Sequence, residues 1–381
     1  MASDHTILVG MSGGVDSSVA AALLRRQGYH VIGVFLCMGR SVEADHDTSG
    51  CCSPQDGDPN CDMSRLGTPA ADARRVAQRL GIDLFVLDAS AGFARLIDDF
   101  IDEYARGRTP NPCIHCNARI KFARLLGRAD ELGAEFVATG HHARLGKGPQ
   151  SRHIAIGDPA APDGRPAILR SRTKDQSYAL MQLPRDWLGR ILLPIGELAD
   201  KAEVRRIAAE LGLEVADKPD SQEICFAGDD HAAFLLRRRP GAFRAGPIID
   251  AAGRELGRHD GVGRFTIGQR RGLGVATGKP VYVTRIDAAT ATVTVGPRDA
   301  LLARGLRAIG ANWHIDPPPV GAEFDAIVQI RYNHEGAAAR VRITGPDSFE
   351  VQFAEPVLAV TPGQAAGLYD GRRLLGGGWI E

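Results

Sequence analysis

The stretch Val9-Gly10-Met11-Ser12-Gly13-Gly14-Val15-Asp16-Ser17-Ser18 decides how the N-terminal part of this chain folds. The apolar run Thr6–Val9, which leads into it, predicts a short buried strand. The segment Ser17–Gln27, rich in Ala and Leu, predicts a helix that Gly28 ends. A glycine-rich turn between a strand and a helix lets the free N–H groups of the first helical turn approach an anion closely. The stretch therefore predicts a phosphate-binding loop.

The polar residues of this loop refine its chemistry. Ser12, Ser17 and Ser18 supply hydroxyl donors. Asp16 would repel a phosphate, so we expect it to orient the loop or a Mg²⁺ ion. No G-x-x-x-x-G-K-[ST] pattern occurs in the chain, which excludes a loop of the Walker type. For the two glycines alone, a tight strand-to-helix turn without a ligand is an equally good interpretation.

The full string Ser12-Gly13-Gly14-Val15-Asp16-Ser17 resembles the S-G-G-x-D-S pyrophosphate loop of the ATP pyrophosphatases. Members of that family cleave ATP between the α and β phosphates and adenylate a substrate oxygen. The resemblance implies this step, whereas the spacing by itself indicates only an anion site.

Beyond the loop, strands and helices alternate. Apolar runs at His30–Leu36, Leu84–Leu87 and Phe136–Thr139 predict strands, and the segments Asp72–Leu80 and Phe93–Ala105 predict helices. This alternation predicts an α/β fold with a parallel sheet wrapped by helices. Ligands of such sheets bind at the carboxyl ends of the strands, where the loop is expected to lie.

Length and composition indicate an ordinary globular protein of two or three domains, with 381 residues and a hydrophobic fraction of 44%. No apolar run is long enough to span a membrane, and the amino end lacks a signal pattern, so we expect a cytoplasmic protein without a membrane partner. Seven cysteines, an odd number, favour thiol chemistry over a disulfide framework.

Charge is distributed unevenly although the formal net charge is zero. The segment from His231 to Arg285 holds eleven Lys and Arg against three acids. A basic segment on an otherwise acidic chain is typical of a polyanion-binding protein. A solvated surface is the competing interpretation, and without motif support it is the better one.

A second informative stretch is Gly107-Arg108-Thr109-Pro110-Asn111-Pro112-Cys113-Ile114-His115-Cys116-Asn117. The prolines keep Asn111 extended, and a helix is predicted from near Asn117 to Leu132. Cys116 would then lie at a helix N-terminus, where the pKa of a thiol is lowered, and Arg119 and Lys121 would act in the same direction. Half of a structural zinc site, or two inert thiols, are the alternatives.

Other candidates are weaker in isolation. His141, which follows the strand Phe136–Thr139, is more typical of a structural histidine, and Lys174 would contact a phosphate or lie in a surface turn. Cys225 follows the polar turn Lys218–Glu223, and a lone cysteine there is more often core. The irregular stretch Cys37–Thr68 contains Cys51, Cys52 and Cys61, with His46 nearby. It predicts a mobile loop with free thiols, and a small zinc site is the alternative.

Taken together, the motifs resemble those of the bacterial tRNA-specific 2-thiouridylases over nearly the whole chain. They are the loop Ser12–Ser18, Gly107–Asn117, Thr139-Gly140-His141, Lys174-Asp175-Gln176, Asp220-Ser221 to Ile224-Cys225-Phe226, Phe265–Arg270, Arg331-Tyr332 and Thr361-Pro362-Gly363-Gln364. The implied reaction replaces the 2-oxygen of the tRNA wobble uridine (position 34) with sulfur, after ATP has adenylated that oxygen. The products are 2-thiouridine, AMP and pyrophosphate.

The resemblance also implies roles for individual residues. Cys225 matches the cysteine that receives a persulfide, and Cys116 matches its partner, which acts as nucleophile or resolves a transient disulfide with Cys225. The residues implied to line ATP are Gly10, Met11, Ser12, Gly13, Gly14, Val15, Asp16, Ser17, Leu36 and Gly140. Those implied to contact the target base or the tRNA are Asn111, Pro112, Cys113, His141, Lys174, Asp175, Gln176, Arg331, Tyr332 and Gln364. The target base must leave its stack, which an unpaired anticodon loop makes easy.

The chain departs from the common family pattern at Cys113, where an aspartate is usual. With Cys116 and Cys225, Cys113 makes a set of three thiols that could hold an iron–sulfur cluster whose free iron carries the sulfur. We keep this cluster as a minority hypothesis. The expected cofactor inventory is otherwise ATP with Mg²⁺ as substrate and no tightly bound group.

The resemblance implies three domains and two macromolecular partners. The expected domains are an ATP pyrophosphatase domain of the adenine-nucleotide α-hydrolase-like type (1–217), a small basic tRNA-binding domain (218–281) and a C-terminal antiparallel β-barrel (282–381). The expected partners are tRNA and a sulfur donor protein, either a cysteine desulfurase or a sulfur relay protein, and we expect a monomer.

Two other classes compete with this interpretation. A pyrophosphate-loop ligase acting on a small metabolite would need neither Cys116, Cys225 nor the basic domain. A non-catalytic RNA-binding protein would need neither the loop nor the thiols once binding is intact.

Overall fold

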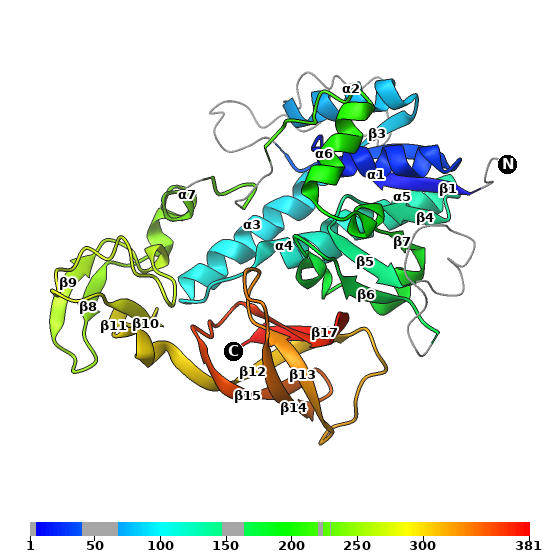
Figure 1. Cartoon of the computed structure of the whole chain (residues 1–381). Helices are drawn as coiled ribbons and strands as arrows, with labels where there is room; N and C mark the ends of the chain where they lie inside the picture. The colour runs from blue at the N-terminus through cyan, green and yellow to red at the C-terminus, as the bar shows by residue number, and fades with distance from the viewer. Residues whose placement is uncertain (1–4, 40–67, 147–163, 220–223, 229) are drawn as a thin grey trace. The chain divides into compact units, whose positions relative to one another are not determined.

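The computed structural model describes residues 5–39, 68–146, 164–219, 224–228 and 230–381 (Figure 1). The chain forms two compact units. The first contains residues 1–95, 113–221 and 372–374, and the second contains residues 96–112, 222–371 and 375–381. Helix α3 (Ser90–Ala105) begins in the first unit and ends in the second.

The first unit is built on the predicted parallel sheet, which has five strands in the order β3-β2-β1-β4-β7. Every neighbouring pair is parallel. The strands are β1 (Thr6–Gly10), β2 (His30–Cys37), β3 (Asp83–Asp88), β4 (Phe136–Ala138) and β7 (Ile191–Leu192). The sequence-based prediction of an α/β fold is therefore confirmed, with β7 as a strand that the sequence did not reveal.

Helices cover this sheet through small and aliphatic side chains. Helix α1 (Val15–Arg26) buries Val19, Ala20 and Leu24 completely, and α2 (Thr68–Leu80) and α6 (Lys201–Glu210) join the same core. Because its alanines carry little bulk, α1 can pack closely on the sheet. Asp200 caps the N-terminus of α6, since its carboxylate accepts the Glu203 N–H at 2.8 Å.

The helical segment that carries Cys113 and Cys116 starts earlier than predicted. It runs through α4 (Pro112–His115), the π-helix η2 (Cys116–Phe122) and α5 (Ala123–Leu132). Cys116 therefore lies one turn inside the segment rather than at its N-terminus, because Pro112 is pre-set for the first helical position. The predicted dipole effect on Cys116 is wrong for this reason.

A small hairpin follows the parallel strand β4. Its strands are β5 (Ala143–Gly146) and β6 (Ala167–Arg170), which pair antiparallel. The remaining short helices of this unit are η4 (Ser177–Leu180), η5 (Arg185–Arg190) and η6 (Pro194–Glu197).

The second unit contains a small sheet of four strands in the order β10-β11-β8-β9. Its strands are β8 (Gly246–Ile249), β9 (Glu255–His259), β10 (Tyr282–Asp287) and β11 (Thr292–Gly296), accompanied by α7 (His231–Arg238), η7 (Pro240–Ala242) and η8 (Val262–Arg264). We expected β10 and β11 to belong to the C-terminal barrel. They pair with each other and β11 pairs with β8, so that expectation is wrong.

The predicted antiparallel barrel is confirmed in the same unit. Its strand order is β12-β15-β14-β13-β16-β17, and β12 pairs with β17 to close it. The strands are β12 (Leu302–Trp313), β13 (Glu323–Gln329), β14 (Ala337–Gly345), β15 (Ser348–Leu358), β16 (Ala365–Asp370) and β17 (Arg373–Ile380), and η9 (Arg298–Leu301) precedes them. No helix in the described part of the chain is long and apolar enough to cross a membrane.

Candidate functional site

The loop between β1 and α1 forms the centre of the candidate site in the first unit. Its hydroxyl groups build the turn: the Ser17 Oγ accepts the Ser12 N–H at 3.1 Å and donates to the Gly14 carbonyl at 3.1 Å. The Ser18 hydroxyl donates to the same carbonyl at 2.9 Å. The first N–H groups of a helix have no acceptor inside the helix, so the start of α1 offers donors to an anion.

Three adjacent strands bring the predicted ATP-lining residues to one edge of the sheet. Gly10 ends β1, Leu36 lies near the end of β2, and Gly140 follows β4. Because these strands are parallel neighbours, their carboxyl ends meet at the same edge. The structure therefore groups the loop with Leu36 and Gly140, as the sequence predicted.

Two glycines of this site are required by close backbone approach. Gly13 has a φ of 73°, and a Cβ there would meet the Pro69 carbonyl oxygen at 2.0 Å. A Cβ on Gly140 would meet the Ser17 nitrogen at 2.5 Å. Side chains at these positions would displace the loop or the start of α1.

Asp16 is held by two partners that the sequence did not indicate. Its Oδ1 accepts from the Lys201 ammonium at 2.6 Å and lies 3.0 Å from the His142 Nε2. Burial raises the pKa of Asp16, but the hydrogen bonds and charges of His142 and Lys201 outweigh it, so the net pKa lies below the ordinary 3.8. These contacts fix the Asp16 side chain, and its predicted roles in orienting the loop or a Mg²⁺ ion stay predictions.

Replacing Asp16 with asparagine tests this arrangement. We expect Asp16→Asn to lower the free energy of unfolding by about 1–3 kcal/mol at neutral pH, because two charge-assisted bonds are weakened. The pKa of Asp16 is lower in the folded state, so the wild-type advantage is present above about pH 4 and is lost as the pH falls through the folded pKa. Urea unfolding of both proteins over this range measures the difference; a constant difference down to the lowest pH would contradict it.

His141 lies beside the loop in a partly buried position. Its ring stacks on Phe122, with 5.8 Å between centroids, and its Nδ1 lies 2.8 Å from the Thr139 hydroxyl. Burial, with Lys121 and His142, lowers the pKa of His141 to about 3 against a small opposing effect of Asp16. His141 is therefore neutral at neutral pH and offers a hydrogen bond rather than a charge.

The turn Lys174-Asp175-Gln176 is built by its own polar groups. The Asp175 carboxylate accepts the N–H groups of Ser171 and Ser177 at 3.0 and 3.2 Å. The Gln176 side-chain oxygen accepts the His142 N–H at 2.8 Å, which joins this turn to the strand end beside the loop. Lys174 adopts a φ of 50°, in the left-handed region.

The three motif cysteines are divided between the units. Cys113 and Cys116 belong to the first unit and lie on successive turns of the α4–η2 segment, Cys113 exposed and Cys116 buried. Desolvation raises the pKa of the Cys113 thiol, and Lys121 opposes it. Cys225 belongs to the second unit and is exposed, so the interpretation of Cys225 as a core residue is wrong.

In the second unit, a barrel loop holds the segment that carries Asn111 and Pro112. The Gln364 side-chain amide donates to the Thr109 carbonyl at 2.8 Å, and the Thr109 N–H donates to the Pro362 carbonyl at 2.8 Å. Gly363, with a φ of 89°, permits this approach, because a Cβ there would lie 3.0 Å from the Thr109 nitrogen. Gln364 and Asn111 are therefore on segments that are fixed to each other.

Arg331 and Tyr332 follow β13 in the same unit. The Arg331 guanidinium donates to the Leu358 carbonyl at 3.1 Å, and the Gln329 amide donates to the carbonyls of both residues. Tyr332 is 42% exposed, which makes its ring one of the few large apolar surfaces open to a ligand. An exposed, well-anchored aromatic ring is suited to stacking on a base.

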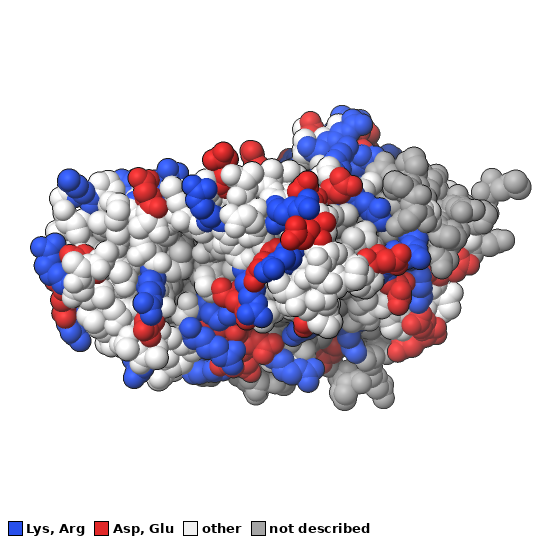
Figure 2. Space-filling view, turned by 90° about the horizontal axis from the view of Figure 1, so that it is seen from below, with Lys and Arg blue, Asp and Glu red and all other residues white. Residues whose placement is uncertain are grey.

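The basic segment 231–285 is partly neutralised by local ion pairs. Arg239, Arg254, Arg258, Arg264 and Arg285 each pair with an acidic residue of the second unit. The cations that make no ion pair with a described residue include Arg237, Arg238, Arg270, Arg271 and Lys279. Figure 2 likewise shows Lys and Arg interspersed with Asp and Glu. The positive charge that this segment offers to a polyanion is therefore smaller than its number of Lys and Arg residues suggests.

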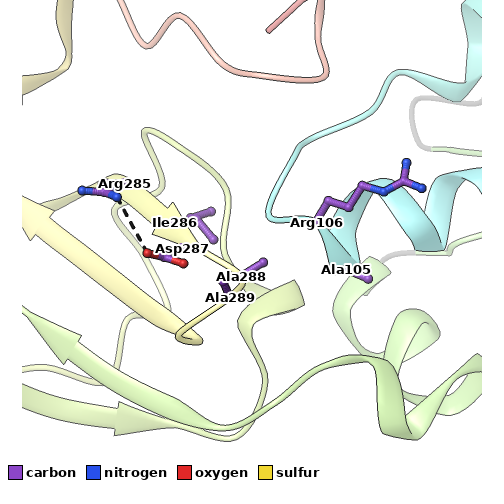
Figure 3. A pocket seen from close by; sticks show the side chains of 7 residues that line it. All are labelled: Ala105, Arg106, Arg285, Ile286, Asp287, Ala288 and Ala289. Carbon is purple, nitrogen blue, oxygen red and sulfur yellow. Dashed lines mark ion pairs between the residues drawn. The ribbon is translucent and has the colours of Figure 1, made fainter.

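A pocket of about 610 Å³ lies in the second unit between the end of α3 and the turn after β10 (Figure 3). Arg285 and Asp287 lie on its β10 side as an ion pair, with 3.7 Å between Nη2 and Oδ2, and Arg106 lies on its α3 side. Its lining residues are Ala105, Arg106, Arg285, Ile286, Asp287, Ala288 and Ala289. None of the lining residues carries a nucleophilic side chain, so the pocket offers no reactive group.

Several residues of the predicted thiol-bearing loop and of the motif that contains Cys225 lie outside the described residues. His46, Cys51, Cys52, Cys61, Asp220 and Ser221 are not described. Cys37, at the start of the stretch expected to carry free thiols, is disulfide-bonded, so the expectation fails at this position. Among the described residues, no group of three or more His, Cys, Asp or Glu side chains is arranged to hold a metal ion.

Sequence reasoning missed Lys201 and His142 as partners of Asp16. His142 follows the predicted site residue His141 directly, and this adjacency was the sequence signal that could have identified it. Lys201 is 185 residues from Asp16, and only the packing of α6 against α1 brings them together.

Three models of protein families match consecutive parts of the chain. They are described as a tRNA methyl transferase HUP domain (residues 5–229), a tRNA methyl transferase PRC-barrel domain (232–297) and an aminomethyltransferase beta-barrel domain (303–380). The three matches follow the parallel sheet, the four-stranded sheet and the barrel in order.

Curated relatives match almost the full chain. A protein of Geobacter metallireducens named tRNA-specific 2-thiouridylase MnmA is 43% identical, covering 98% of this chain and 96% of its own length. Proteins of the same name from Roseiflexus sp. and Carboxydothermus hydrogenoformans are each 45% identical and cover 98% of this chain, with 98% and 97% of their own lengths.

Proposed function

Because this chain belongs to the family of tRNA-specific 2-thiouridylases, we propose that it replaces the 2-oxygen of a tRNA wobble uridine with sulfur. The observation that carries the proposal is similarity over nearly the full length of both proteins, which includes all three domains. Neither a small-metabolite ligase nor a non-catalytic RNA-binding protein accounts for that extent of similarity.

ATP would serve the first half of the reaction. The uridine O2 attacks the α-phosphate of ATP, pyrophosphate leaves, and the oxygen becomes part of an AMP leaving group. The loop Gly10–Ser17 and the start of α1 offer N–H and hydroxyl donors to the phosphates. A Mg²⁺ ion, as part of the nucleotide substrate, would neutralise the pyrophosphate.

The two motif thiols would serve the second half. A sulfur donor protein leaves a persulfide on Cys225, whose terminal sulfur attacks C2 of the adenylated uridine as AMP departs. The Cys116 thiolate then attacks the Cys225 sulfur, breaks its bond to the transferred sulfur and releases 2-thiouridine. The resulting Cys116–Cys225 disulfide is reduced by a cellular thiol. The exposure of Cys225 suits delivery of sulfur by another protein.

The RNA would be held by groups of both units. In the second unit, the exposed Tyr332 ring suits base stacking. The cations without an ion pair to a described residue suit phosphate contacts; they include Arg237, Arg238, Arg270, Arg271 and Lys279. Neutral His141 would contribute a hydrogen bond, together with the Lys174–Gln176 turn. Asn111, Pro112 and Cys113 would adjoin the target base.

A cluster mechanism is the alternative for sulfur transfer. Cys113 and Cys116 are spaced by one helical turn, which suits two thiolate ligands on one face, and Cys225 would be the third. Protein purified without oxygen distinguishes the two mechanisms. Iron-free protein that is active supports the persulfide pair, whereas activity that rises with iron content contradicts it.

Release of pyrophosphate tests the proposed activity. Purified protein with MgATP is expected to release pyrophosphate only when a tRNA with uridine at the wobble position is added, and to release AMP when a sulfur donor protein is added as well. The same tRNA with cytidine at that position is the control and should give none. Equal release with both RNAs, or release with a small metabolite alone, would contradict the proposal.

A further inference from the structure

The side chain of Lys218, a residue that is not part of the phosphate loop, contacts the backbone of that loop. Its ammonium donates to the Gly13 carbonyl at 3.0 Å and to the Asp72 carboxylate at 2.5 Å. The Asp72 side chain is 9% exposed and also accepts from Arg75, so the ammonium is fixed by a nearly buried acid. Lys218 begins the polar turn that precedes Cys225 in the sequence, and the proposed reaction does not use it.

The backbone of Lys218 is fixed as well. Arg205, on α6, donates to the carbonyl of Lys218 at 3.0 Å and to that of Ala216 at 2.6 Å. Arg205 therefore holds the backbone of Lys218, and Asp72 holds its ammonium, while the ammonium donates to Gly13. An unsupported surface lysine would lose more side-chain entropy in making the same bond.

The acceptor of this bond belongs to the peptide unit between the two glycines of the loop. The peptide unit between Gly13 and Gly14 is flanked by two residues without a Cβ, so it can rotate between two orientations at little steric cost. In a trans peptide the C=O and N–H groups point in opposite directions. A bond that fixes the Gly13 carbonyl toward Lys218 therefore directs the Gly14 N–H to the opposite side.

We propose that Lys218 is a positioning residue that fixes the Gly13–Gly14 peptide so that its N–H faces the bound phosphate. The inference rests on the proposed binding of ATP at this loop. The positive charge on Lys218 also polarises the peptide, which makes the Gly14 N–H a stronger donor to an anion. Lys218 itself contacts no phosphate in this arrangement.

Binding of MgATP to single and double variants tests the role. We expect Lys218→Met to weaken MgATP binding by about 10- to 100-fold, as expected for a lost charge-assisted hydrogen bond. Gly14 has a φ of −104°, and a Cβ there would have the Ser12 Oγ as its nearest neighbour, at 3.5 Å. Gly14→Ala thus fits the present orientation, whereas the rotated peptide would need a positive φ that alanine disfavours.

Alanine at position 14 should therefore keep the peptide that follows Gly13 in its present orientation without Lys218. In the Gly14→Ala background, we expect Lys218→Met to weaken MgATP binding by less than about threefold, whatever Gly14→Ala does alone. Asp72→Asn, which loosens the ammonium but keeps it, should cost about 3- to 10-fold. Isothermal titration measures the affinities, and thermal unfolding checks that each variant is folded.

The outcomes separate this inference from the proposed function. A large loss in the wild-type background and a small loss with Gly14→Ala support it. Equal losses in both backgrounds, or no loss in either, overturn it while leaving the function intact. If the unmodified protein binds no MgATP, the proposed function is overturned and the inference with it. If Lys218→Met does not fold, an unchanged affinity in Asp72→Asn overturns the inference.

Discussion

Replacing Cys225 with alanine is expected to reduce formation of 2-thiouridine to below about one thousandth of the wild-type rate. The proposed persulfide forms on this thiol, and alanine has no atom that could carry the sulfur. Because Cys225 is exposed, its loss leaves no cavity in the core. The variant should therefore fold, and thiolation in a reconstituted assay with a sulfur donor protein measures the effect.

The affinity of Cys225→Ala for tRNA provides the internal control. We expect it to equal that of the wild type, because the proposed phosphate and base contacts are made by other residues. A small-metabolite ligase would keep its full activity in this variant. Retained thiolation, or a loss of thiolation that merely follows a loss of tRNA affinity, would contradict the assigned role.

Replacing Gly13 with alanine is expected to weaken MgATP binding by about 100-fold or more. The φ of 73° at this position costs an L-residue about 1–2 kcal/mol, and the new Cβ would lie 2.0 Å from the Pro69 carbonyl oxygen. Both effects act on the loop, because the contact involves backbone atoms that cannot rotate away. Calorimetric titration with MgATP measures the loss.

Gly127→Ala is the matched control for this substitution. Gly127 lies inside α5, and a Cβ there would meet no atom within 4 Å. The change should leave MgATP affinity unaltered and raise stability by about 0.5–1 kcal/mol, since alanine favours the helix interior. Equal affinities of Gly13→Ala and Gly127→Ala would show that the loop conformation does not matter for ATP.

The parallel sheet and the loop could be predicted from sequence because their signals are local. The strand that ends at Gly10, the glycines that follow and the Ala-rich helix are consecutive, and each has its own pattern. The edges of these elements moved by one to four residues. Asn111 lies outside the helix, as expected for a residue before proline, but the helix begins at Pro112 rather than near Asn117.

Several strands were missed because their patterns are set by tertiary contacts. Strand β12 is exposed along much of its length, and Leu302 is 48% exposed, so it lacks an apolar face. Strand β17 carries Gly376, Gly377 and Gly378, which ordinarily argue against a strand. A Cβ on Gly376 would lie 2.3 Å from the Asn312 carbonyl oxygen, so the close pairing of β12 and β17 requires glycine.

The sequence indicates the candidate reactive groups of the site. It does not indicate the residues whose side chains hold those groups in place. Cys116, Cys225 and the loop stand in recognisable motifs. Lys201 and Lys218 contact the loop from positions about 200 residues away, and no local pattern distinguishes them from surface lysines. The role of Gln364 in holding Thr109 depends likewise on the folded barrel.

Analysis of the tRNA itself tests the central claim most directly. Unmodified tRNA is incubated with the protein, MgATP and a cysteine desulfurase with cysteine, and the tRNA is then cleaved to oligonucleotides whose masses and sequences are determined by mass spectrometry. The account predicts 2-thiouridine at the wobble position, one AMP for each sulfur transferred and no product without ATP. Thiolation at another position, thiolation that does not need ATP, or unmodified tRNA under conditions where the protein binds both substrates would contradict it.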